Sequence, residues 1–103
     1  MAEGFLDILG VDVLPSAVHA GDNVTIIVHT KNIGASDNFN VEMVGDFIDS
    51  SEFYLNTGLT KDVIFLFVMP DKDIFLTINT YHYEEKIGWV WDVTSRWDID
   101  RWF

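Results

Sequence analysis

Apolar and polar residues alternate with a period of two along several short stretches of the chain. Between residues 39 and 43, Phe39, Val41 and Met43 are apolar, and the two residues between them are polar. Residues 24–30 show a similar alternation. Successive side chains of a β-strand point to opposite faces, so this pattern predicts strands with one buried face and one solvated face.

The same alternation assigns faces near both ends of the chain. It places Leu9 and Val11 together on the buried face of the first strand. Near the C-terminus it places Trp89 and Trp91 on one face. We expect these two indoles to pack inside the fold, because large aromatic side chains dominate protein cores.

Turn-forming residues separate the alternating stretches at short and fairly even intervals, among them Pro15, Gly21, Gly45, Gly58 and Pro70. Such spacing is typical of an all-β sandwich or barrel, and no stretch forms a convincing amphipathic helix. The predicted strands span residues 5–14, 23–31, 38–45, 53–57, 62–69, 73–83 and 88–94, with a candidate eighth strand at 97–103.

Two segments do not match a strand with one buried face. Residues 63–69 are apolar on both faces, which predicts either a central strand or an edge strand that a partner covers. Residues 46–55 are compatible with one helical turn that begins at Ser50 or Ser51. They are equally compatible with an irregular crossover between two sheets.

Length and composition narrow the function classes. The 103 residues suit one domain, residues 1–103. The absence of cysteine excludes disulfides, thiolate metal sites and a cysteine nucleophile. With 17 acidic and 6 basic side chains the formal charge is -11, which argues against nucleic acid as a partner because phosphate contacts need clustered Lys and Arg.

The acidic residues are scattered along the chain, which predicts a solvated surface that keeps an apolar domain soluble. The longest apolar run, residues 63–70, has the length of a strand and is too short to span a membrane. The N-terminus shows no basic segment followed by an apolar one, so we expect no signal peptide.

A familiar order of turns and strands runs through most of the chain. A strand that ends at Pro15 is followed by Gly21-Asp22, by the strand Val-Thr-Ile-Ile-Val and then by Asn32-Ile33-Gly34. This order resembles the immunoglobulin-like CARDB-type domains of archaeal and bacterial surface proteins. The resemblance is strongest over residues 9–94 and implies a single antiparallel Ig-like β-sandwich of about seven to eight strands. We expect positive φ angles at Gly21 and in the turn that contains Gly34.

The three histidines are His19, His29 and His82. A zinc site needs three or four converging ligands, and nothing in the spacing of these residues requires convergence. His29 and His82 would meet only if their strands paired. We therefore interpret all three as ordinary surface or sheet-face histidines and predict no metal site.

Loop carboxylates offer one alternative to that expectation. Asp46, Asp49, Asp71 and Asp73 lie in predicted loops, and loop carboxylates at one end of a sandwich can collect Ca²⁺. No calcium-loop signature is present, so solvated turn aspartates are the preferred interpretation.

Catalytic motifs are missing from the sequence. It contains no Gly-rich phosphate loop, no Gly-x-Ser-x-Gly elbow and no Ser-x-x-Lys motif. We therefore predict that the chain is not an enzyme and needs no cofactor.

Aromatic residues are concentrated near the C-terminus, in residues 81–103. They are candidates for an intramolecular edge strand, for a protein interface, or for a surface that stacks on sugar rings. The candidate interface residues are Tyr81, Tyr83, Trp97, Ile99, Arg101, Trp102 and Phe103.

These observations favour a noncatalytic structural or interaction module that docks through an aromatic edge onto copies of itself or onto a larger assembly. Free-standing Ig-like domains occur as accessory or decoration modules of phage and archaeal-virus particles, and the resemblance makes a virion the preferred location. The alternative is a cell-surface adhesion or ligand-binding domain that recognises glycans or uses Ca²⁺.

Overall fold

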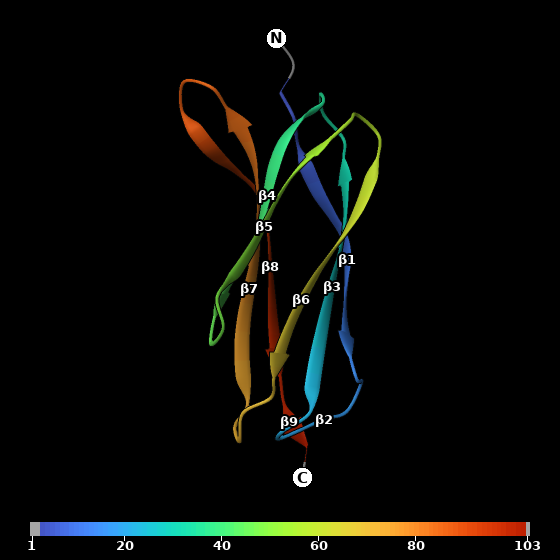
Figure 1. Ribbon diagram of the computed structural model, residues 1–103, viewed down its shortest axis with the longest axis vertical. Coiled ribbons are helices and arrows are strands. Elements are labelled where there is room, and N and C mark those ends of the chain that lie inside the picture. The colour runs from blue at the N-terminus through green and yellow to red at the C-terminus, as the bar shows by residue number, and fades with distance from the viewer. Residues whose placement is uncertain (1–2, 103) are drawn as a thin grey trace.

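Two antiparallel sheets form the body of the molecule in a computed structural model that describes residues 3–102 (Figure 1). The first sheet has the strand order β1-β3-β6. Its strands are β1 (Leu6–Leu14), β3 (Asn23–Asn32) and β6 (Thr60–Val68). The second sheet has the order β5-β4-β7-β8. Its strands are β4 (Asp37–Gly45), β5 (Asp49–Leu55), β7 (Ile74–Glu84) and β8 (Gly88–Ile99).

Two very short strands complete the described chain. β2 (Val18–His19) and β9 (Arg101–Trp102) pair in parallel. Residues 3–102 contain no helix, so the predicted all-β sandwich is confirmed. Within these residues no helix is long and apolar enough to cross a membrane.

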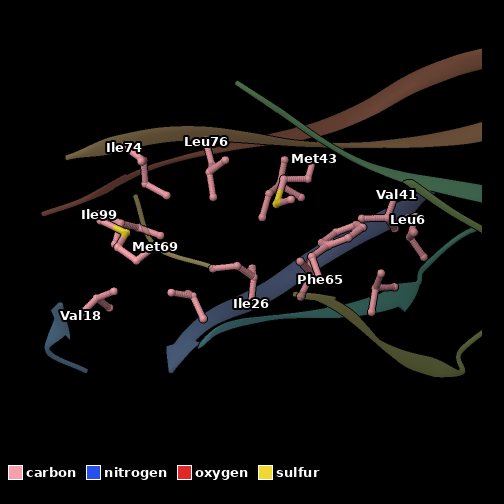
Figure 2. Close-up of a cluster of buried hydrophobic side chains, with 14 of the residues drawn as sticks. Leu6, Val18, Ile26, Val41, Met43, Phe65, Met69, Ile74, Leu76 and Ile99 are labelled. Atoms are coloured by element: carbon pink, nitrogen blue, oxygen red, sulfur yellow. The ribbon is translucent and has the colours of Figure 1, made fainter. Parts of the chain in front are cut away.

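The core lies between the two sheets. Figure 2 shows side chains from both layers, such as Ile26 of β3 and Leu76 of β7, filling the space between them. Phe39 and Phe65 are the largest fully buried side chains. The inward residues of β3 and β4 are those that the alternation predicts. Both strands continue without a bulge, so every second residue stays on the same face, which we call the parity of the strand.

Two β-bulges change the faces predicted for β1 and β8. In β1, Ile8 pairs with Thr30 and Gly10 with His29, so Leu9 is the extra residue. Leu9 is therefore exposed, and its predicted burial is wrong. An extra residue reverses the parity of a strand, which puts Ile8 and Val11 on the same inward face although they are three positions apart.

The bulge in β8 lies at Asp92, between the partners of Thr80 and Tyr81. It turns Asp92 into the core and leaves Trp89 and Trp91 on the outer face, 38% and 58% exposed. The prediction that these indoles pack inside the sandwich is therefore wrong.

Asp92 and Thr80 bind the first sheet to the second. The backbone N–H of Leu6, which is fully buried, donates to Asp92 Oδ2 over 3.0 Å. The Thr80 hydroxyl donates to the Leu6 carbonyl oxygen over 2.7 Å. Both backbone groups of one β1 residue are thus satisfied by side chains of the opposite sheet.

Two other segments differ from their predictions. Residues 46–55 contain no helical turn, since β5 begins at Asp49 and pairs with β4 along its whole length. The candidate eighth strand at 97–103 is in fact the continuation of β8 to Ile99, followed by the short β9. Phe103 lies outside the described residues.

Glycines shape two of the turns in different ways. Gly21 has a φ of 87°, as the sequence predicts. Gly34 is not among the positive-φ residues, so that expectation is wrong. A Cβ atom at Gly34 would lie 2.3 Å from the Glu3 carbonyl oxygen, so glycine is needed there for close backbone approach.

Candidate functional site

An apolar surface covers the outer face of the three-stranded sheet. We call it the aliphatic face and define it as Leu14, Ile27, Ile64, Leu66 and Val68. In the register, Leu14 and Leu66 flank Thr25, and Ile27 lies beside Ile64. Leu66 is 70% exposed, and Ile64 and Val68 are more than half exposed. Contiguous apolar surface of this kind marks interaction sites on soluble proteins.

The strand that supplies most of this face is also an unprotected sheet edge. β6 has β3 on one side and no partner strand on the other within the described chain. Its stretch from Val63 to Val68 carries no charge, no proline and no bulge. For residues 63–69 the sequence predicted either a central strand or an edge strand that a partner covers. The strand order places this segment at the edge of its sheet.

The other three edges carry features that discourage pairing. β1 has the Leu9 bulge, and β8 has a bulge that directs a carboxylate inward at Asp92. β5 carries Asp49 and Glu52. Bulges and charges are the usual protection against edge-to-edge pairing. β6 carries Lys61 and Asp62 near its start, but its stretch from Val63 to Val68 lacks both kinds of protection.

A histidine bridge lies beside the aliphatic face. His29 Nε2 is 2.7 Å from Asp12 Oδ2, and His29 Nδ1 is 2.7 Å from Asp62 Oδ1, so one imidazole joins β1, β3 and β6. The hydrogen bonds to Asp12 and Asp62 raise the pKa of His29 above its ordinary value.

Aromatic side chains gather on the outer face of the four-stranded sheet. We call this surface the aromatic face and define it as Tyr54, Tyr81, Tyr83, Trp89 and Trp91. The rings of Tyr83 and Trp89 meet edge to face with their centroids 5.4 Å apart. A cavity of about 230 Å³ beside this pair is lined also by Asn38, Glu52 and Phe53.

The predicted interface residues do not form one cluster. Tyr83 is exposed on the aromatic face, whereas the Tyr81 hydroxyl donates to Glu42 Oε1 over 2.9 Å. Trp97 packs against the core, and Ile99 is only 6% exposed and belongs to the core. Ile99 is therefore not available to a partner. It is buried because β8 continues to this residue and pairs there with Ile74 of β7.

The remaining C-terminal residues lie elsewhere. Trp102 is 56% exposed, and Arg101 forms an ion pair with Asp71. The backbone N–H of Arg101 donates to Asp73 Oδ1 over 2.7 Å. Phe103, the last of the predicted set, lies outside the described residues.

The four candidate calcium ligands each contact other groups of the protein and do not surround a common point. Asp46 binds Lys72 Nζ at 3.1 Å and accepts the Phe75 N–H at 2.7 Å, and these contacts lower the pKa of its carboxyl group. Asp49 accepts the backbone N–H of Ser50. With Asp71 and Asp73 both turned to Arg101, these carboxylates do not converge on one point in the described part of the chain.

A group of ligating side chains that sequence reasoning did not identify surrounds His82. This histidine is 5% exposed on the inner face of β7, whereas His29 lies on the outer face of the other sheet, so the two do not meet. His82 Nδ1 is 2.5 Å from Asp92 Oδ1, and His82 Nε2 is 2.8 Å from Glu84 Oε2. Glu3 Oε2 lies 3.8 Å from the same Nε2 atom.

Electrostatics at this histidine involve opposing effects. Burial opposes protonation of His82, but the hydrogen bonds to Asp92 and Glu84 outweigh it and raise the pKa of the imidazole. Burial disfavours the charged form of Asp92 as well, and for a carboxyl group this raises the pKa. The one available signal in the sequence was the i, i+2 spacing of His82 and Glu84, which places both on one face of a strand.

Comparison with known proteins adds no assignment. No family model matches the chain, and no curated protein matches it.

Proposed function

We propose that this chain is a noncatalytic interaction module that binds an extended segment of another protein by strand addition at β6. The observation that carries this proposal is the combination of the aliphatic face with the unprotected β6 edge. An added strand would pair with the open side of β6 and place alternate side chains against Ile64, Leu66 and Val68. Main-chain hydrogen bonds then supply affinity and the side chains supply specificity.

Charge indicates what the partner segment carries. The chain has a formal charge of -11, and Asp12 and Asp62 border the aliphatic face. A segment in which apolar residues alternate with Lys or Arg complements both features. A second copy of the chain would bring like charges together, so we favour a basic partner over self-association.

The preferred setting is a larger assembly. The CARDB-like Ig resemblance suggests an accessory or decoration component of a phage or archaeal-virus particle, and a cell-surface adhesion domain is the alternative. The genes beside the coding gene distinguish the two settings. Capsid, portal or tail genes there would support the particle, whereas S-layer or secretion genes would contradict it.

A peptide titration tests the binding mode. The probe is a short synthetic peptide of alternating Ile and Lys, and the control peptide has the same composition with its Ile and Lys residues in separate blocks. We expect amide NMR shifts along β6 with the alternating peptide and weaker binding of the block peptide. Shifts that spare β6, or equal binding of both peptides, would overturn strand addition.

Two matched variants locate the contact. Leu66 and Ile87 are 70% and 71% exposed, but only Leu66 belongs to the aliphatic face. Leu66→Lys should weaken peptide binding at least about tenfold, while Ile87→Lys leaves it unchanged. Light scattering of the free chain should give a monomer. A dimer that Leu66→Lys abolishes would make a second copy the occupant and overturn the basic partner.

A glycan-binding function is the second candidate, and the aromatic face favours it. Tyr83 and Trp89 form the wall of a cavity that also offers the polar side chains Asn38 and Glu52. Aromatic rings that stack on sugars, beside amide and carboxylate groups, are suited to carbohydrate binding. A glycan array tests this function with two variants. Trp91→Ala removes an exposed ring of the aromatic face and should bind less. Trp102→Ala removes a similarly exposed ring that lies off this face, and it should bind like the parent.

A further inference from the structure

We propose that Glu3, His82 and Glu84 form a Zn²⁺ site that fastens the N-terminal segment to β7. Among the described residues this is the group of His, Asp and Glu side chains whose ligand atoms lie close together, all within 4.8 Å of one another. A nitrogen and two carboxylate oxygens are ligands that Zn²⁺ accepts. Its three ligands belong to neither the aliphatic face nor the aromatic face, although Tyr83 of the aromatic face lines the cavity beside them.

The distances suit a metal of this size. His82 Nε2 is 2.8 Å from the Glu84 oxygen and 3.8 Å from the Glu3 oxygen. Bonds of about 2.0–2.1 Å at tetrahedral angles place two zinc ligands roughly 3.3 Å apart. The two observed separations lie on either side of that value, so small side-chain movements would bring both carboxylates into place.

A supporting residue already orients the imidazole. Asp92 Oδ1 accepts a hydrogen bond from His82 Nδ1 at 2.5 Å, and Asp92 is itself held by the Leu6 N–H. A proton on Nδ1 leaves the lone pair of Nε2 directed at the two glutamates. A carboxylate behind a ligating histidine is the usual arrangement at protein zinc sites.

The arrangement of charge gives the metal a role at Nε2. His82 has a carboxylate at each ring nitrogen, so an acceptor faces Nε2 as well as Nδ1. Zn²⁺ bound at Nε2 would compensate the charges of Glu84 and Glu3, whose carboxylates both face that atom.

The site is open to solvent on one side. A cavity of about 400 Å³ is lined by Glu3 and Glu84 together with Asp37 and Glu85. This opening gives the ion a path of entry and leaves room for water as a remaining ligand. The acidic residues of this lining outnumber its one basic residue, Lys86, so the cavity attracts a cation.

Calorimetric titration of the EDTA-treated chain with ZnCl₂ tests the proposal. We expect one Zn²⁺ per chain and a higher melting temperature with Zn²⁺ than with EDTA. With Co²⁺ as a probe, we expect visible absorption from a nitrogen and oxygen ligand set. Absence of stoichiometric binding would overturn the proposal.

Variants assign the binding to these residues. Glu84→Gln and Glu3→Gln should each weaken Zn²⁺ binding at least about tenfold, because each removes a charged ligand. Glu85→Gln removes the same charge from the same cavity and should bind like the parent. Equal affinity of Glu84→Gln and Glu85→Gln would overturn the assignment.

Two further variants test whether Asp92 supports the site and whether another histidine binds the metal. Asp92→Asn should weaken binding by about 10- to 100-fold with Glu84 intact. If this variant does not fold, the glutamate variants still decide the question. His29→Gln should retain binding, and loss of binding there would place the metal on the outer face and contradict the proposal.

Discussion

The side-chain amide of Asn32, at the end of β3, donates a hydrogen bond of 3.0 Å to the carbonyl oxygen of Leu55, at the end of β5. These strands belong to different sheets, so one buried side chain joins the two layers. The same amide nitrogen donates to the Ala35 carbonyl, and Asn32 Oδ1 accepts the Gly34 N–H at 3.0 Å.

Replacing Asn32 should therefore be costly. Asn32 is fully buried, and Asn32→Ala removes the side-chain donor from the carbonyl oxygens of Ala35 and Leu55. We expect the free energy of unfolding to fall by about 3 kcal/mol, measured by urea denaturation. Asn38→Ala, at an exposed position of β4, should change it by less than about 0.5 kcal/mol. Similar losses at both positions would contradict the bridging role.

Two isoleucines test the placement of the C-terminal part of β8. Ile99 is 6% exposed, and Ile64 is 57% exposed. Ile99→Ala should lower the free energy of unfolding by about 3 kcal/mol, because it removes buried methyl groups and leaves a cavity. Ile64→Ala should cost less than about 0.5 kcal/mol. Urea denaturation distinguishes them, and a neutral Ile99→Ala would remove Ile99 from the core.

Shortening the C-terminus should have sharply different effects at two positions. Deletion of residues 96–103 removes the part of β8 that pairs with β7 between Ile74 and Thr77, together with buried Ile99. We expect loss of the cooperative thermal transition followed by circular dichroism. Deletion of residues 101–103 removes only β9 among the described strands and should preserve that transition. Identical melting of the two shortened chains would contradict this account.

The His29 bridge predicts a pH-dependent contribution to stability. Asp12 and Asp62 raise the pKa of His29 in the folded state, so folding favours the protonated imidazole. The contribution is complete below the unfolded pKa of about 6.5 and is lost as the pH rises through the raised folded value. Denaturation of the parent and His29→Gln should thus differ more at about pH 5.5 than at about pH 8.5. A difference that grows with pH would contradict the bridge.

Alternation predicted the strands well and failed at the bulges. β3 and β4 keep one parity throughout, so Ile26 and Val41 are buried as expected. At Leu9 and Asp92 an extra residue reverses the parity, and a pattern of period two contains no signal for it. The polar start of β5 was missed for another reason, since Ser50 and Ser51 form a strand only through pairing with β4.

The candidate sites were predicted less completely than the fold. The two-sided apolar character of β6 was visible in the sequence, but its edge position depends on the strand order. The group around His82 depends on the Asp92 bulge and on the approach of Glu3 from the N-terminal segment. Contacts between residues that are distant in sequence come from the topology, which residue spacing does not encode.

The hydrogen bonds between Leu6 and the opposite sheet affect how the molecule responds to a pulling force. β1 begins at one end of a molecule 52 Å long, and β9 lies at the other end (Figure 1). A pulling force between these ends runs along the strands and loads the contacts of Leu6 with Asp92 and Thr80 in shear. Such contacts resist together and do not open one at a time, so the sandwich would act as a stiff link under tension.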